Sequence, residues 1–166
     1  NIAWAADLAA NEGRDVLIEP INTRDMPGYF LNFQAQAHDI VNAIGAPNLK
    51  VQMDLYHCQI MEGDLIRTVE ANLDLIDHIQ LADHPGRHEP GTGEINYDFL
   101  LPALDAIGYK GFVGCEYKPL ADTATANRIR APMRICIAAT DTEANTIAPI
   151  IVPGTRPTAT HRTTVH

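Results

Sequence analysis

Short apolar runs alternate with longer helical segments through most of this chain, and this alternation restricts its fold more than any other feature. Four apolar runs lie at residues 16–21, 50–57, 78–83 and 111–117. Helices are predicted before and between them, at about residues 1–15, 34–44, 64–76 and 97–107. Strands that alternate with helices form a parallel sheet covered by those helices. The sequence therefore predicts an α/β fold, either a barrel or an open doubly wound sheet.

Polar side chains at the C-terminal ends of the predicted strands favour the barrel. They are Glu19, Asp54, Gln80 and Glu116, separated by 35, 26 and 36 residues. A (β/α)8 TIM barrel has roughly 31 residues per unit and builds its active site at these strand ends. We interpret residues 1–122 as the C-terminal half of such a barrel, with about four β/α units. A half-barrel is expected to expose two apolar sheet edges.

The same four side chains suggest a metal site. Three carboxylates at one rim would repel one another unless a cation lay among them. Oxygen ligands suit Mg²⁺ or Mn²⁺ better than zinc, which prefers histidine and cysteine. The alternative is that each acidic residue only caps a helix or bonds to a neighbour.

Charge and hydropathy exclude several classes of partner. The chain has 12 basic and 21 acidic residues and a net charge of −9. It lacks the basic face that nucleic acids or anionic membranes require. We also recognise no transmembrane run and no signal peptide, so the expected location is the cytoplasm. The three cysteines show no disulfide framework or zinc-binding spacing.

The last part of the chain differs in composition. Residues 1–127 contain 7 basic and 19 acidic residues, whereas residues 128–166 contain 5 and 2. We interpret residues 123–166 as an atypical tail rich in threonine, arginine and proline, either out of frame or divergent.

Four segments resemble a known family: LIEPIN, QMDLYH, HIQLADHPGRHEPGTGEINY and GCEYKP. They are similar to the last four strand segments of hydroxypyruvate isomerases and 2-oxo-tetronate isomerases, in the xylose isomerase-like barrel superfamily. The resemblance implies a (β/α)8 fold, a divalent metal and an aldose–ketose isomerisation, which is an intramolecular oxidoreduction. It also implies that Glu19 and Glu116 are the catalytic pair, and that Glu19, Asp54, Gln80 and Glu116 are the metal ligands.

The residue types fit that chemistry. Two carboxylates on opposite sides of a substrate can move a proton between neighbouring carbons through an enediolate. The expected substrate is a small hydroxy-oxo acid, either hydroxypyruvate, which would give tartronate semialdehyde, or a 2-oxo-tetronate. His57, Arg87 and Lys118 are candidates for binding it, Arg87 in the bidentate way that arginine favours. A loop-bonded histidine and solvated surface charges are the alternatives for these three.

Two other functions remain open. A ketose 3-epimerase of the same superfamily uses a similar glutamate pair, but the resemblance implies that it has histidine where this chain has Gln80. An inactive barrel fragment is the second alternative. Self-association that closes the barrel is a further expectation.

Overall fold

The computed structural model describes residues 1–121, 135–136 and 163–165, and the predicted tail lies outside them except for two short strands. The helices are α1 (Ile2–Ala10), α2 (Gln34–Ile44), α3 (Leu55–Met61), α4 (Leu65–Ala71) and α5 (Tyr97–Ala106). The strands are β1 (Val16–Ile18), β2 (Leu49–Asp54), β3 (Ile76–Leu81), β4 (Phe112–Cys115), β5 (Ile135–Cys136) and β6 (Thr163–Val165).

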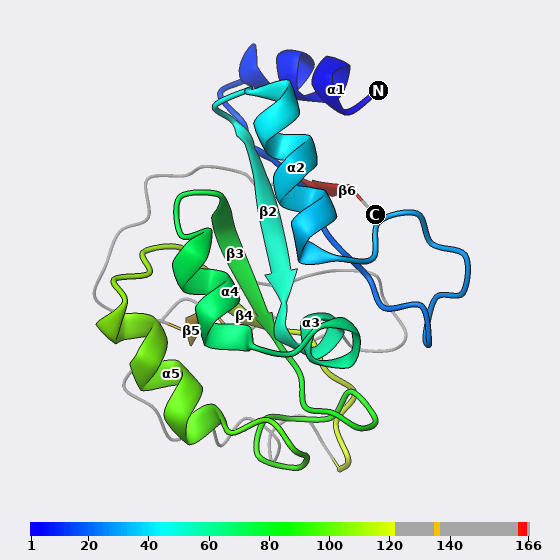
Figure 1. Ribbon diagram of the computed structural model, residues 1–166, viewed down its shortest axis with the longest axis vertical. Helices are drawn as coiled ribbons and strands as arrows, with labels where there is room; N and C mark the ends of the chain where they lie inside the picture. Colours follow the sequence, from blue (N-terminus) through cyan, green and yellow to red (C-terminus); the bar gives the residue numbers. More distant parts are fainter. Residues whose placement is uncertain (122–134, 137–162, 166) are drawn as a thin grey trace.

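All six strands belong to one parallel sheet, in the order β5-β4-β3-β2-β1-β6 (Figure 1). The strands β1 to β4 therefore lie side by side in chain order, as four consecutive β/α units require, and this prediction is confirmed. β6 pairs with β1 and β5 pairs with β4, so the two edges of the open sheet are these short strands and not β1 and β4.

The two faces of the sheet differ in polarity. On one face, apolar side chains such as Val51, Met53 and Ile79 belong to the buried core, to which Val41 of α2 and Leu104 of α5 also belong. Because side chains alternate along a strand, the neighbours of these residues point to the other face. There Gln52 lies beside His78, and Asp54 beside Gln80, in the register of β2 and β3. The second face is thus polar near the C-terminal ends of the strands.

Two element boundaries differ from the prediction. The apolar run at residues 50–57 is a strand only as far as Asp54, whose carboxylate accepts a hydrogen bond from the N–H of Tyr56 and caps α3. β3 begins at Ile76, which was predicted to lie in the preceding helix, because α4 ends at Ala71.

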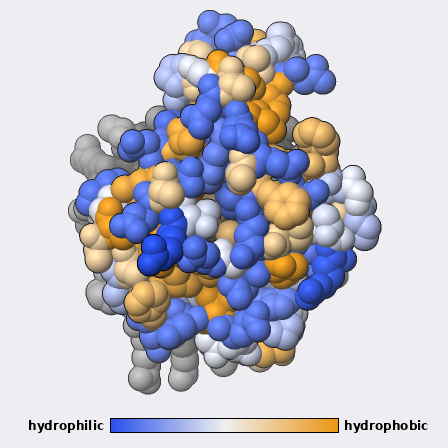
Figure 2. Space-filling model, in the orientation of Figure 1, coloured by the Kyte–Doolittle hydropathy of each residue, from blue (hydrophilic) through white to orange (hydrophobic). Residues whose placement is uncertain are grey.

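Figure 2 shows a surface of mixed polarity, with hydrophobic residues near the upper end, where α1 and α2 lie. The exposed aromatic side chains include Trp4 of α1 and Phe30 of the loop after β1. Both line an apolar hollow of about 540 Å³, which Glu19 also borders. Within the described part of the chain, every helix is too short or too polar to cross a bilayer.

Candidate active site

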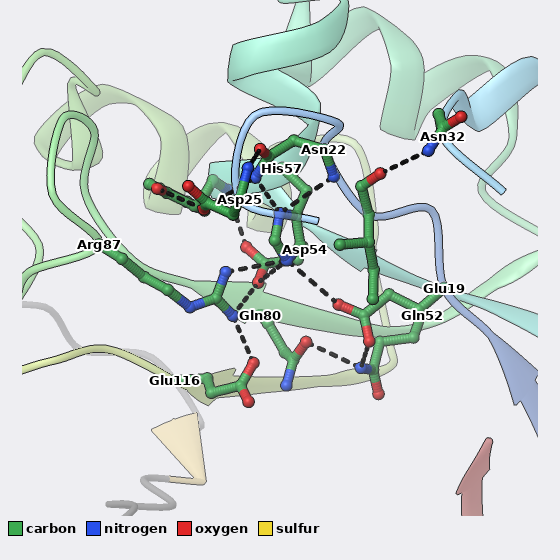
Figure 3. A network of polar contacts seen from close by, with 12 residues as sticks. Glu19, Asn22, Asp25, Asn32, Gln52, Asp54, His57, Gln80, Arg87 and Glu116 are labelled. Carbon is green, nitrogen blue, oxygen red and sulfur yellow. Dashed lines mark hydrogen bonds and ion pairs between the residues drawn. The ribbon is translucent and has the colours of Figure 1, made fainter. Parts of the chain in front are cut away.

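The parallel strands all end on the same side of the sheet, so the side chains at their C-terminal ends lie close together (Figure 3). Glu19 directly follows β1, Asp54 ends β2, Gln80 is the penultimate residue of β3, and Glu116 directly follows β4. Glu19 and Asp54 are almost fully buried, whereas the Glu116 side chain is about one-third exposed. The positions agree with the sequence analysis, and the roles of the residues stay predictions.

Glu19, Asp54 and His57 form the tightest group of potential metal ligands. One ligand atom from each lies within 4.8 Å of the others, and all three residues are buried. Two carboxylate oxygens and an imidazole nitrogen at this separation can hold a divalent ion. His57, which was predicted to bind substrate, therefore lies where it could also bind a metal.

Arg87 lies in the middle of the carboxylates. Its Nη2 atom is 2.7 Å from Oδ2 of Asp54 and 2.5 Å from Oε2 of Glu116. Burial lowers the pKa of Arg87, but the negative charges of Asp54, Glu116 and Glu19 outweigh this effect and raise the pKa above its usual value. Arg87 is thus a permanent counter-ion for the cluster.

Arg87 also contacts His57. Its Nη1 atom lies 2.9 Å from Nε2 of His57. The same Nε2 atom is 3.7 Å from Oδ2 of Asp54 and 3.9 Å from Oε1 of Glu19. Nε2 of His57 therefore lies beside both the guanidinium and the carboxylates, where a metal or a substrate hydroxyl could meet it.

Gln52 belongs to the site and was not identified from the sequence. Its Nε2 atom donates to Oε2 of Glu19 at 2.7 Å and to Oε1 of Gln80 at 2.8 Å. It lies two residues before Asp54 on the same strand and so faces the same side of the sheet. That spacing is the sequence signal that could have identified it.

A second group of polar residues packs beside His57. The hydroxyl of Tyr56 donates to Oδ2 of Asp25 at 2.8 Å, and the Tyr56 ring centroid is 4.9 Å from Cζ of Arg87. Burial and the bond to Asp25 raise the pKa of Tyr56 to about 12. The Asn22 side-chain nitrogen lies 2.6 Å from Nδ1 of His57. Asn22 and Arg87 thus contact the two different ring nitrogens of His57.

Lys118 differs from Cys58 and Cys115 in burial. Lys118 is exposed, and its backbone N–H donates to the carbonyl of Arg87. Cys58 and Cys115 are buried, and burial raises the pKa of each thiol to about 12. Neither cysteine has the lowered pKa of a reactive thiol.

Comparison with known proteins places this geometry in context. The family model described as "Xylose isomerase-like TIM barrel" matches residues 1–132. A 2-oxo-tetronate isomerase of Cupriavidus necator is 55% identical over 124 residues, which are 75% of this chain and 48% of the relative. The hydroxypyruvate isomerase of Escherichia coli is 46% identical over 134 residues, 81% of this chain and 52% of the relative. The chain thus spans about half the length of these curated relatives.

Solved structures agree with the sequence comparisons. A protein named AP endonuclease, family 2, from Brucella melitensis is 48% identical and superposes with a TM-score of 0.72. The match covers 75% of this chain and 48% of that one. The IOLI protein, solved with a bound zinc atom, is 26% identical, with a TM-score of 0.58 over 70% of this chain and 44% of its own.

Proposed function

The chain belongs to the xylose isomerase-like TIM barrel family, and from that premise we propose that it isomerises a short hydroxy-oxo acid with the help of a divalent metal. The predicted barrel-type fold is confirmed by the family match and by the superposition. The proposed substrate is hydroxypyruvate or a 2-oxo-tetronate, because the relatives are named for these compounds.

The observation that carries the proposal is the gathering of three strand-end carboxylates around one arginine. Asp54 and Glu116 both bond to Arg87. Glu19 lies beside the same group, with its Oε1 atom 3.9 Å from Nε2 of His57. An isomerase of this kind needs carboxylates that can accept and return a proton, and a cation that can hold the substrate. Both requirements are met by the side chains at this edge of the sheet.

The proposed reaction moves one proton between carbons. One of the two glutamates, Glu19 or Glu116, removes a proton from the hydroxymethyl carbon of hydroxypyruvate, and an enediolate forms. The other glutamate, which enters the reaction as the carboxylic acid, gives its proton to the former carbonyl carbon and becomes a carboxylate, while the hydroxyl proton passes between the two oxygens. The product is tartronate semialdehyde, and no external oxidant or reductant is needed.

A metal site fits the residues that are present. Glu19, Asp54, Gln80 and Glu116 offer mainly carboxylate oxygens, with His57 as a neighbouring nitrogen donor, and such a set suits a hard divalent ion. When bound, Mg²⁺ or Mn²⁺ would stabilise the negative charge that develops on the substrate oxygens.

Arg87 is well placed to bind the substrate carboxylate. A guanidinium group has five N–H donors, and three contacts within the described residues use Nη1 once and Nη2 twice. The N–H of Nε and one N–H of Nη1 lie outside these three contacts and can each donate to a substrate oxygen, whereas a bidentate contact requires an Nη2 hydrogen to leave Asp54 or Glu116. Lys118 is a second, more exposed cation for the same purpose.

The test is exchange of substrate protons in D₂O. The chain is incubated with Mn²⁺ and hydroxypyruvate, and proton NMR follows deuterium incorporation and the aldehyde signal of the product. Turnover that is lost after treatment with a chelator and restored by Mn²⁺ would support the proposal.

The alternatives give different results. Turnover of a ketohexose without turnover of hydroxypyruvate would favour a ketose 3-epimerase. A folded chain that exchanges no proton of either substrate would favour an inactive barrel fragment.

A further inference from the structure

Arg87 lies in the loop between β3 and α5, and a buried aspartate organises this loop. Asp83 is fully buried two residues after the end of β3. Its carboxylate accepts hydrogen bonds from four backbone N–H groups of the loop: His84 at 2.9 Å and Ile95 at 3.0 Å on Oδ1, Gly91 at 2.8 Å and Thr92 at 3.1 Å on Oδ2. One side chain thus joins the first residues of the loop to the last.

The backbone closes the loop further and leaves little space inside it. The N–H of Asp83 donates to the carbonyl of His88 at 2.8 Å, and that of Glu94 donates to the carbonyl of His84 at 2.7 Å. A Cβ atom at Gly93 would collide with the carbonyl oxygen of His84 and lie only 2.6 Å from Oδ1 of Asp83. The loop therefore has a single tight packing around the Asp83 carboxylate.

Arg87 lies at the part of this loop that faces the active-site carboxylates. Its backbone has a left-handed φ of 58°, which an arginine adopts only when its surroundings hold it there. Its carbonyl accepts from the N–H of Lys118 at 2.6 Å, so the loop is also joined to the segment after Glu116. The placement of the Arg87 side chain therefore depends on the shape of the whole loop.

We propose that Asp83 is a positioning residue that shapes the loop at residues 84–95 and so holds the Arg87 guanidinium against Asp54 and Glu116. Its effect on catalysis rests on the proposed function, whereas its effect on Arg87 does not. A carboxylate is required because its two oxygens offer enough lone pairs for four N–H donors. An amide would turn its own NH₂ group toward two of these donors.

The test compares Asp83→Asn with Asp98→Asn in the full chain. Asp98 is exposed at the start of α5, so its substitution removes the same charge without touching the loop interior. The first measurement is the ¹H–¹⁵N NMR signal of the Arg87 Nε–H group, identified by its absence in Arg87→Lys. The signal should move toward those of exposed arginines in Asp83→Asn and stay unchanged in Asp98→Asn.

The second measurement is kinetic. Asp83→Asn should raise KM for hydroxypyruvate about 10- to 100-fold, the range expected for a misplaced binding group. In an Arg87→Lys background the same substitution should change KM less than about twofold, because Asp83 acts through Arg87. If Asp83 only stabilised the fold, the factors by which the two substitutions change KM would multiply in the double variant.

Two results would overturn the inference. One is an unchanged Arg87 Nε–H signal in folded Asp83→Asn. The other is an increase in KM from Asp83→Asn that is as large in the Arg87→Lys background as in the unmodified chain. If Asp83→Asn does not fold, Asp83→Glu, which keeps the carboxylate but moves it away from the four N–H donors, is judged by the same NMR criterion. If the unmodified chain lacks isomerase activity, the proposed function fails, and the NMR comparison still tests Asp83.

Discussion

Arg87 bonds to Asp54 through its Nη2 atom, at 2.7 Å from Oδ2, and the same nitrogen contacts Glu116. A cation of the chain itself is thus bonded to two of the four residues predicted to bind metal. Arg87 and a divalent ion are both attracted by the same carboxylates. The arginine therefore influences metal affinity as well as substrate affinity.

Replacing Arg87 by methionine should separate these two effects. Loss of the guanidinium leaves Asp54 and Glu116 without their counter-ion, so the cluster should bind Mn²⁺ more tightly, by about tenfold, since nearby unit charges interact by roughly 1–4 kcal/mol. Affinity for the hydroxy-oxo acid should fall. Titration with Mn²⁺ at constant ionic strength measures the first effect. The control is Arg67→Met, at an exposed position of α4. Weaker Mn²⁺ binding in Arg87→Met would contradict this prediction.

The two glutamates predicted to transfer protons should both be essential for isomerisation. Glu19→Gln and Glu116→Gln keep the size of the side chain but remove the base, and each should lower kcat by about 10²- to 10⁴-fold. Deuterium exchange in D₂O measures this loss with saturating Mn²⁺. Glu70→Gln, on the exposed surface of α4, is the matched control. Near-normal deuterium exchange in either active-site variant would show that this glutamate does not transfer the proton.

The sequence predicted the site residues that depend on local position along a strand. Glu19, Asp54 and Glu116 could be identified because polar residues at regular spacing end apolar runs, and parallel strands bring such ends together. The fold class followed from the same alternation. In both cases the signal is a short local pattern that repeats from one β/α unit to the next.

The contacts that the sequence did not predict are long-range ones. Arg87 was identified as a candidate, but its bonds to Asp54, 33 residues away, and to Glu116, 29 residues away, depend on the folded loop. The contact of Arg87 with His57, 30 residues away, depends on the same loop. The helix that contains His57 was missed for another reason, because Asp54 was interpreted as the end of a strand and not also as the N-cap of α3.

Asp25 should make stability depend on acid pH. Burial raises its pKa, but hydrogen bonds from Asn22 and Tyr56, with the charges of His57 and Arg87, outweigh this effect and lower the pKa below its usual value. The folded pKa lies below the unfolded one. Asp25 therefore contributes stability above the unfolded pKa, and this contribution is lost as pH falls through the folded pKa.

Urea unfolding of Asp25→Asn and the unmodified chain checks this expectation. The variant should be less stable at pH 7, and the difference should shrink when both are measured in acid below the usual aspartate range. Asp39→Asn serves as the control for removing a carboxylate. A difference that stays constant with pH would show that Asp25 acts through packing alone.

The apolar hollow beside Glu19 predicts self-association. Trp4 is 69% exposed and Phe30 is 81% exposed, and both border this hollow of about 540 Å³. Exposed aromatic groups around an apolar concavity are typical of an interaction surface. We expect two copies of the chain to associate through this surface, as the predicted self-association that closes the barrel requires. Sedimentation velocity over a hundredfold range of concentration measures the association, and Trp4, the single tryptophan, reports it by a blue shift in fluorescence.

Trp4→Glu should keep the chain monomeric, because burial of a carboxylate in the interface is costly. Glu12→Gln, at an exposed position after α1, should leave the association unchanged. A monomeric mass of the unmodified chain at every concentration would contradict the expectation, and would mean that the hollow is not a contact between copies.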